Sequence, residues 1–437
     1  MANILHITPH FGGGVGTVLR ALIDGIAKNS DHKQEVVSFE YLNEKTMRWV
    51  ELNSIAAYSD VLSDSEWLQK RVCNADIVHI HFWNHPALYY FIYTISGQSA
   101  RIVMWSHVNG HFAPYLFNDA VIDFPEIYVV STKYSLSQKK LCCRSNKWKS
   151  KHLRTVHSTA GLNGFDKIEP MEHRGINVGY IGTVDYVKMH RDFINIFSEV
   201  QNQEANFIVC GGNSHEDVHR EAEQIGIADR FDFLGQVEDV KSILTKIDIF
   251  AYPLNRENYG TGEQVLIEAM SAGIPQVVFA DGPEEIVVED GVTGFVCNNN
   301  LEFSKAIDHL CNDEKLRKIM GRNSKQRAKK YFNFDKSLKK WLSIYDELYL
   351  RDKNVSHFEV VQSGDIAVDL FLLSLGECKA QGIFEEIFQY YPNDIPVSLL
   401  KQAKELPSIF KSETRGSAKH YNSFFKSERL FTLSNQI

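Results

Sequence analysis

The sequence predicts an α/β protein built on parallel sheets, and three observations indicate this class. Short apolar runs at residues 4–8 and 247–252 are each followed by a glycine-containing loop and then by residues with helical spacing. The second run is continuous rather than alternating, as in a parallel strand that is covered on both faces. At 437 residues the chain is also too long for one core, so we expect two or three domains of about 100–200 residues each.

The first strand, at residues 4–8, leads into the glycine-rich loop 9–16 and an amphipathic helix from residue 17 to about 28. A glycine turn between a strand and a helix binds phosphate in Rossmann-like folds. Its glycines alternate, so the loop lacks the Gly-x-Gly-x-x-Gly fingerprint of dinucleotide sites. Glu40 follows the next predicted strand and could bind a ribose, so this loop alone leaves a nicotinamide-dependent dehydrogenase open.

Histidines stand at or near the ends of the next two predicted strands, residues 75–82 and 101–107. For His81, His107 and His111 two interpretations stay open, a structural hydrogen bond or a role in the site. A further strand at residues 127–131 precedes a helix for which Ser131 or Thr132 is the expected cap.

Residues 139–154 contain seven basic side chains, no acidic one, and Trp148. The basic residues are Lys139, Lys140, Arg144, Lys147, Lys149, Lys151 and Arg154. This segment is either a solvated loop or a surface that binds anionic lipid head groups or a lipid-linked diphosphate.

The second half of the chain predicts strands at residues 177–183, 206–212, 231–237, 247–252 and 276–280. The loop after 247–252 lies at the carboxyl end of its strand, where ligands bind in open α/β sheets. Gly260 and Gly262 let the backbone approach a ligand, and the following helix start favours phosphate. Glu263 and Glu268 offer carboxylates that can accept hydrogen bonds from the vicinal hydroxyls of a ribose or hexose.

Residues 257–275 resemble the donor-site motif of the retaining glycosyltransferase family 4 (glycosyl transferases group 1), which has the GT-B fold. In that motif two glutamates, separated by seven residues, are followed by Ala-Met-x-x-Gly-x-Pro, and residues 268–275 fit this ending. Without a gap the first glutamate falls on Gly260, whereas a loop three residues longer places Glu257 there. The resemblance therefore implies that Glu268 binds the ribose and that Glu257 or Glu263 contacts the transferred sugar.

The same resemblance assigns further residues to the donor and to the reacting carbon. Lys188 matches the lysine of the family's Gly-Arg-x-x-x-x-Lys, but Thr183 replaces its arginine, so Arg191 or Arg256 would have to supply the missing charge. His107 is implied to lie near the donor phosphate and the reacting carbon. The other implied donor contacts are Gly13, Gly14, Gly211, Gly212, Gly235, Gly260, Thr261, Gly262 and Gln264.

The resemblance implies GT-B architecture, with two Rossmann-like domains facing across a cleft. We expect an acceptor domain at residues 1–172, a nucleotide-sugar donor domain at 173–350, and a mostly helical extension at 351–437. The implied reaction moves a hexosyl group from a UDP-sugar or GDP-sugar to a hydroxyl of a glycan or lipid-linked acceptor with retention of configuration, in surface polysaccharide or lipopolysaccharide assembly. Because no Asp-x-Asp loop is visible, neither a metal nor a cofactor is expected. A GT-B sugar phosphorylase or epimerase and a non-catalytic nucleotide-sugar-binding or glycan-binding relative stay as alternatives.

Charge and cysteine content bear on partners and compartment. The net charge of −8 gives no reason to expect nucleic acid as a partner. Seven cysteines without Cys-x-x-Cys spacing are typical of a reduced, cytoplasmic protein. We expect no signal peptide and no transmembrane helix, and a cytoplasmic location with peripheral contact to the membrane left open. The last residues, 411–437, either pack on the cleft or form a homo-oligomer contact.

Overall fold

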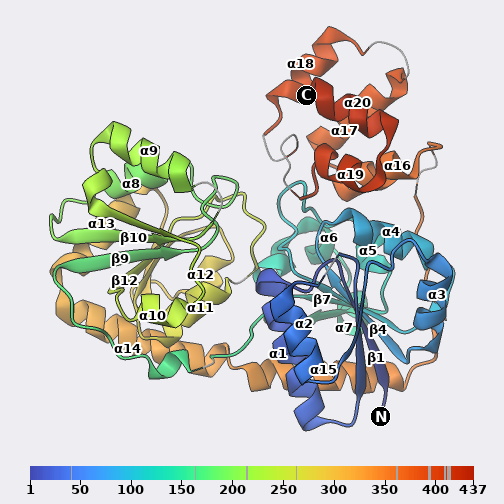
Figure 1. Ribbon diagram of the computed structural model, residues 1–437, viewed down its shortest axis with the longest axis horizontal. Helices are drawn as coiled ribbons and strands as arrows, with labels where there is room; N and C mark the ends of the chain where they lie inside the picture. Colours follow the sequence, from blue (N-terminus) through green and yellow to red (C-terminus); the bar gives the residue numbers. More distant parts are fainter. Residues whose placement is uncertain are drawn as a thin grey trace. The chain divides into compact units, whose positions relative to one another are not determined.

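The computed structural model describes all residues except 41, 163, 213–214, 262, 361–362, 392–394, 408–409 and 411–414. The chain forms two compact units. The first unit consists of Met1–Val156 together with Leu338–Ile437, and the second is the continuous segment His157–Ser337. Each unit is built on its own parallel sheet, which confirms the predicted fold class (Figure 1).

The sheet of the first unit has seven parallel strands in the order β3-β2-β1-β4-β6-β7-β8. Its strands are β1 (Asn3–Thr8), β2 (Lys33–Ser38), β3 (Ala56–Ser59), β4 (Ile77–Phe82), β6 (Ile102–Ser106), β7 (Ile127–Val130) and β8 (Leu153–Thr155). A separate antiparallel pair joins β5 (Ser99–Ala100) to β15 (Asn354–Val355). The strand order reverses between β1 and β4, so the loops after these two strands diverge at a topological switch point.

The helices before residue 156 connect these strands. They are α1 (Gly13–Asn29), α2 (Glu44–Leu52), α3 (Ser65–Asn74), α4 (Pro86–Thr94), α5 (Asp119–Asp123), α6 (Lys139–Cys142) and α7 (Asn146–His152). Helix α1 begins within the predicted glycine loop, where Gly13 has a φ of 60° that favours glycine. Its buried side chains include Leu19, Ile23 and Ile26, which recur at the helical spacing expected of a face against a core.

The helix predicted after β7 is a short 3₁₀ helix at Tyr134–Ser137, and of the two predicted caps Thr132 is in place, since its hydroxyl oxygen accepts from the backbone N–H of Tyr134 at 3.2 Å. The Ser131 hydroxyl donates to the carbonyl of Ser106, 2.6 Å away on the neighbouring strand, and is therefore not available as a cap. The basic segment that follows forms α6 and α7 rather than a loop.

Helices α14 (Glu314–Tyr331) and α15 (Phe334–Tyr349) follow the second sheet in the sequence. From Leu338 onward α15 belongs to the first unit, where Trp341 and Tyr345 are buried. The rings of Trp341 and His79 on β4 have centroids 4.4 Å apart, so this helix covers the sheet at β4. The fold thus recruits a late segment to complete the core of its first unit.

The C-terminal extension is helical, as predicted. It contains α16 (Ile366–Ser374), α17 (Lys379–Tyr390), α18 (Val397–Glu405), α19 (Ala418–Phe425) and α20 (Glu428–Gln436). Helices α16 and α19 pack against α4. The hydroxyl of Tyr421 on α19 donates to the buried Asn84 Oδ1 at 3.2 Å, so the extension is anchored just after β4.

The second unit has a six-stranded parallel sheet in the order β11-β10-β9-β12-β13-β14. Its strands are β9 (Ile176–Ile181), β10 (Ala205–Cys210), β11 (Phe231–Gly235), β12 (Ile249–Tyr252), β13 (Gln276–Phe279) and β14 (Gly294–Cys297). Its other helices are α8 (Phe193–Ser198), α9 (His215–Ile225), α10 (Val240–Leu244), α11 (Gln264–Ser271), α12 (Glu284–Val287) and α13 (Asn300–Asn312). The switch point lies between β9 and β12, the two strands that precede the loops singled out in the sequence.

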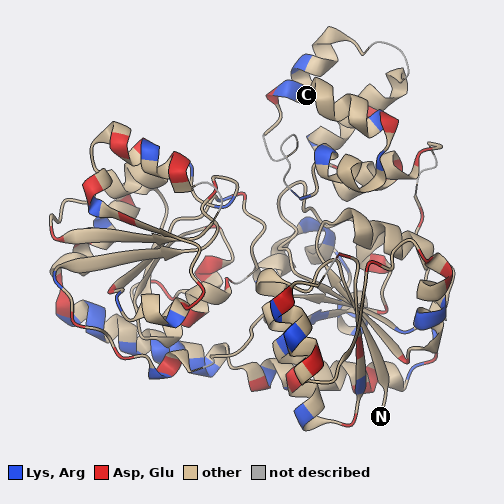
Figure 2. Cartoon of the chain, viewed as in Figure 1, with Lys and Arg blue, Asp and Glu red and all other residues tan. Residues whose placement is uncertain are grey.

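Charge is unevenly distributed over the second unit. Figure 2 shows Lys and Arg gathered along α14, whose sequence contains one acidic residue, Glu314. The opposite face of this helix buries small side chains such as Ser324 and Ala328. No helix in the described part of the chain is long and apolar enough to cross a bilayer.

We expect Trp341→Ala to lower the free energy of unfolding of the first unit by about 3–5 kcal/mol, because it leaves a cavity against His79 and Trp105. Urea unfolding followed by circular dichroism measures the loss. Lys339→Ala, at an exposed position of the same helix, should change it by no more than about 0.5 kcal/mol. Equal losses in the two variants would show that α15 does not complete this core.

Candidate functional site

Two loops leave the second sheet at its switch point, one after β9 and one after β12. The first contains Thr183 and Lys188, and the second ends at Glu263, the residue before α11. Because β9 and β12 are parallel neighbours, the two loops emerge side by side at the same edge of the sheet. Side chains that are 75 residues apart in the chain therefore meet there.

An ion pair links these loops. The Lys188 ammonium lies 2.7 Å from Glu263 Oε2, and the two side chains are only 17% and 10% exposed. The hydroxyl of Tyr252, the last residue of β12, donates to the same oxygen at 2.8 Å. Burial lowers the pKa of Lys188, but attraction to Glu263 outweighs it, so the pKa lies above its ordinary value and the ammonium stays charged.

Glu263 has a strained backbone. Its φ of 35° lies in the left-handed region, which non-glycine residues rarely adopt. Strain of this kind persists when surrounding contacts hold the residue, and it clusters at functional sites. Here Lys188 and Tyr252 hold the carboxylate. Gly260 packs so closely that a Cβ there would lie 2.1 Å from Glu263 Oε1.

Gln264 and Glu268 form a second polar group on the first turns of α11. The Gln264 side chain donates to Glu268 Oε1 at 3.1 Å and accepts from the backbone N–H of Ala160 at 3.1 Å. Burial raises the pKa of Glu268 to about 7, and the hydrogen bond from Gln264 opposes part of that rise. At neutral pH this carboxyl is therefore divided between its protonated and ionised forms.

Sequence reasoning missed two residues that interact with Glu263, Tyr252 and Glu284. Glu284, at the start of α12, is buried, and burial together with the nearby Glu263 charge raises its pKa to about 8. Its Oε1 has no hydrogen-bond partner among the described residues. The Gly-Pro turn before Glu284, directly after an apolar strand, was a usable signal, since the same strand, loop and helix order located Glu263.

The glycine loops after β9 and β10, together with the segment after β11, line an open pocket of about 300 Å³. Its lining includes Gly182, Thr183, Gly211, Gly212 and Gln236. No side chain fits at Gly211, because a Cβ there would lie 1.8 Å from the carbonyl oxygen of Gly182. The backbone N–H of Gly211 donates to the carbonyl of Gly235 at 2.7 Å, so three predicted glycine positions, Gly211, Gly212 and Gly235, lie together.

Several predicted residues lie apart from this group. Glu257 is exposed on the β12 loop, which also contains Thr261, whereas Gly262 lies outside the described residues. The guanidinium of Arg256 pairs with Asp281 at 3.6 Å and lies over the Phe279 ring. That of Arg191 lies over the Tyr186 ring, 4.9 Å from its centroid.

The remaining predicted residues, Gly13, Gly14 and His107, belong to the first unit. His107 follows β6 and is 8% exposed, with Nε2 lying 3.2 Å from Nδ1 of His81. Burial lowers the pKa of His107 to about 3, so its ring is neutral at physiological pH. The third strand-end histidine, His111, makes a hydrogen bond to the backbone carbonyl of Tyr134 at 3.1 Å.

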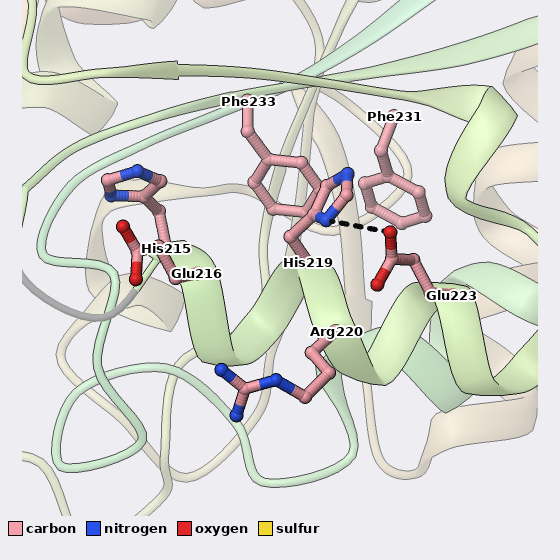
Figure 3. A pocket seen from close by; sticks show the side chains of 7 residues that line it. All are labelled: His215, Glu216, His219, Arg220, Glu223, Phe231 and Phe233. Carbon is pink, nitrogen blue, oxygen red and sulfur yellow. Dashed lines mark ion pairs between the residues drawn. The ribbon is translucent and has the colours of Figure 1, made fainter.

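A larger pocket, of about 460 Å³, lies between α9 and the edge strand β11 (Figure 3). Its lining includes His219 and Glu223, which approach to 3.6 Å, and the rings of Phe231 and Phe233. None of the site residues predicted from the sequence lines it. Its volume alone therefore does not make it the functional site, and the switch-point loops stay the better candidate.

The segment that contains the switch-point loops is similar to a known family. Residues 166–327 match the family model described as Glycosyl transferases group 1. D-inositol 3-phosphate glycosyltransferase of Corynebacterium kroppenstedtii is 26% identical over 192 residues, which cover 41% of this chain and 42% of that protein. The capsular polysaccharide biosynthesis glycosyltransferase CapM of Staphylococcus aureus is 25% identical over 262 residues, or 55% of this chain and 66% of that protein. The match thus spans less than half of the first relative and just under two thirds of the second.

Solved structures agree with the fold. The crystal structure of Anabaena HepE in complex with UDP superposes with a TM-score of 0.64 at 15% identity, covering 79% of this chain and all of that one. At this identity the likeness shows the fold, which is that of GT-B glycosyltransferases.

We expect Lys188→Met and Glu263→Gln each to lower the free energy of unfolding by about 3–5 kcal/mol, because each leaves a mostly buried partner uncompensated. The double variant should lose less than the sum of the two single losses, which a double-mutant cycle in urea measures. Lys318 and Glu314 on α14 are an exposed ion pair in the same unit, and their cycle should show a much smaller coupling. Additive losses at Lys188 and Glu263 would contradict a stabilising pair.

Proposed function

Because the chain carries a glycosyl transferases group 1 domain over residues 166–327, we propose that it is a glycosyltransferase that uses a nucleotide-sugar donor. One observation carries this proposal: the ion-paired Lys188 and the glycine pocket lie at the switch point of the matched domain. A mostly buried ammonium at the same edge of the sheet as a glycine-lined pocket is suited to a diphosphate. The solved HepE structure contains UDP, which supports a nucleoside diphosphate here, with a UDP-sugar or a GDP-sugar as the donor.

Each polar group has a proposed role toward this donor. When the diphosphate binds, the Lys188 ammonium pairs with its oxygens instead of with Glu263. The released carboxylate of Glu263, or that of Glu257, then accepts a hydrogen bond from the transferred sugar. Glu268 accepts hydrogen bonds from the ribose hydroxyls. Gly211, Gly212 and Gly235 leave room for the nucleoside. His107 contributes from the first unit near the reacting carbon, and Gly13 and Gly14 contact the phosphates.

The proposed reaction is a hexosyl transfer with retention of configuration. The bond between the anomeric carbon and the diphosphate oxygen breaks, and a bond to the acceptor oxygen forms on the same face of the sugar. The acceptor hydroxyl gives its proton to the departing phosphate oxygen. Lys188 stabilises the negative charge that develops on the leaving group, so no metal and no further cofactor are required in this scheme.

The proposed acceptor is a hydroxyl of a glycan or of a lipid-linked saccharide in surface polysaccharide assembly. The similarity to CapM, a glycosyltransferase of capsular polysaccharide biosynthesis, supports the glycan acceptor. We propose a cytoplasmic protein that makes peripheral contact with a membrane through residues 139–154. Lys140 and Arg144 in that segment already pair with Asp119, at 2.7 and 2.6 Å, so only part of its positive charge is available to lipid.

A non-catalytic nucleotide-sugar-binding relative is the second candidate. The observation that favours it is Thr183 in place of an arginine, together with the pairing of Lys188 with Glu263, which leaves the diphosphate one lysine that is already neutralised. Such a protein would bind the donor and transfer nothing. A measurement of sugar transfer from the bound donor to an acceptor distinguishes the glycosyltransferase from the non-catalytic relative.

We expect the purified protein to be stabilised against heat by one nucleotide class in a panel of UDP-, GDP-, ADP- and CMP-sugars, equally with and without EDTA. A ligand at about 100 times its dissociation constant adds ~2.7 kcal/mol to the free energy of unfolding.

Lys188→Ala and Glu268→Ala should each slow transfer by more than about tenfold, since each loses a charge-assisted contact of about 1.5–3 kcal/mol. Rates within a factor of about two of the unmodified protein in both variants would contradict the assignment.

The affinity for that donor should rise about tenfold from pH 6 to pH 8, because only ionised Glu268, whose pKa is about 7, accepts from both ribose hydroxyls. Glu268→Gln should flatten this dependence of donor affinity on pH in calorimetric titrations.

In the free protein, stability changes with pH in the opposite direction to donor affinity. Since the folded-state pKa is raised, the folded chain holds the proton longer, and Glu268 lowers the free energy of unfolding as pH rises toward 7.

A further inference from the structure

Four histidines lie on one face of the first sheet. His6 on β1 is the register partner of His79 on β4, and His81 is two residues further along the same strand, so all three point to one side. His107 follows β6 and stacks on His81 with ring centroids 5.4 Å apart. The first three side chains are fully buried and the fourth is 8% exposed. Fully buried imidazoles need hydrogen-bond partners, and here most of them are other imidazoles.

Three of these rings form a continuous chain of hydrogen bonds that begins at Gln34 on β2. Gln34 Oε1 lies 3.2 Å from His6 Nε2, and His6 Nδ1 lies 3.2 Å from His81 Nε2. His81 Nδ1 in turn lies 3.2 Å from His107 Nε2. This chain of hydrogen bonds therefore runs from the amino-terminal part of β2 to the carboxyl edge of the sheet.

Gln34 fixes the direction of every bond in this chain. Its amide nitrogen donates to the carbonyl of Ile23 at 3.0 Å, so its oxygen is the atom that faces His6 and can only accept. His6 must then carry its proton on Nε2, which leaves Nδ1 as an acceptor. The same reasoning places the proton of His81, and then that of His107, on Nε2. The Nδ1 atom of His107 is left as an acceptor.

We propose that Gln34, His6 and His81 are positioning residues that hold His107 in its Nε2-protonated tautomer, so that its Nδ1 accepts a hydrogen bond from a sugar hydroxyl. This inference rests on the proposed function for the place of His107, but the tautomer itself follows from the hydrogen bonds. A neutral ring in this tautomer offers a lone pair and no positive charge. His107 therefore orients a hydroxyl and does not replace the missing arginine at the diphosphate. Burial keeps the pKa of each of these histidines below its ordinary value, consistent with neutral rings.

A metal ion is the rival explanation of the same cluster. Among the described residues, His6, His79 and His81 form the one group with ligand atoms close enough together to hold an ion, and His79 Nε2 has no hydrogen-bond partner. Against it, His6 Nδ1 and His81 Nε2 are already bonded to each other, and the group contains no carboxylate to offset a buried dication. The tautomer chain accounts for more of the contacts.

Nitrogen-15 NMR of the imidazoles in the full-length protein tests the proposal directly, because the shifts of Nδ1 and Nε2 report which nitrogen carries the proton. We expect His6, His81 and His107 all to be protonated on Nε2, with less than one tenth of an equivalent of transition metal per chain by elemental analysis. A proton on Nδ1 of His107, or one equivalent of bound metal that elemental analysis finds and His6→Gln abolishes, would overturn the proposal. This measurement needs no activity, so it stands or falls separately from the proposed function.

The matched variants are Gln34→Leu and Gln69→Leu. Gln69 also donates from its side chain to a backbone carbonyl, that of Thr94 at 3.0 Å, and it lies outside the histidine chain. Gln34→Leu should mix the two tautomers of His107 and lower kcat/KM about two- to tenfold, the effect of one neutral hydrogen bond. Gln69→Leu should leave both the NMR pattern and kcat/KM unchanged. If Gln34→Leu keeps His107 protonated only on Nε2 in a folded protein, Gln34 does not set the tautomer and the proposal fails.

Discussion

The ion pair between Lys188 and Glu263 is the interaction on which the second unit's site depends. It joins the loops after β9 and β12, and it compensates a strained residue just before α11. A mostly buried ammonium without this partner would be a large cost, so the two loops stabilise each other's conformation. Tyr252 completes the arrangement from the end of β12. Lys188 is therefore held in position by Glu263 before any anion enters the site. Binding of an anion exchanges the carboxylate partner of Lys188 for the anion, and does not fill an empty cationic pocket.

Burial also limits the charge of the site. Glu268 and Glu284 both have raised pKa values because they are buried, and Glu263 is paired. Three carboxyls can therefore stand near a phosphate site without their full negative charge. The same principle operates in the first unit, where buried histidines stay neutral and interact through directed hydrogen bonds. In both units desolvation sets the protonation state, and the hydrogen-bond partners then set the orientation of each side chain.

The sequence predicted the elements of the fold better than their contacts. Short apolar runs located most strands of the two sheets, because buried parallel strands have a strong local signal, but β3, β8 and β14 were missed. The pairing of Lys188 with Glu263 had no such signal, since it depends on β9 and β12 being neighbours across a crossover. For the same reason the period of the strands could place His79 and His81 on one face but could not bring His6 beside them. The sequence could not choose between the two predicted caps after β7, because Ser131 is excluded by its bond to the adjacent strand, a contact that no local pattern contains.

The order of the chain has a consequence for its synthesis on the ribosome. The second unit is one uninterrupted segment, whereas the first needs α15, which is translated after the whole of the second unit. Until residues 338–349 emerge, the sheet face that carries His79 and Trp105 lacks the helix that covers it. The nascent chain therefore exposes an aromatic, aggregation-prone surface of the first unit while the second unit can already fold. A chaperone that binds this surface during elongation would prevent its association with other chains. Rare codons that pause translation before α15 would lengthen the time for which the surface is exposed.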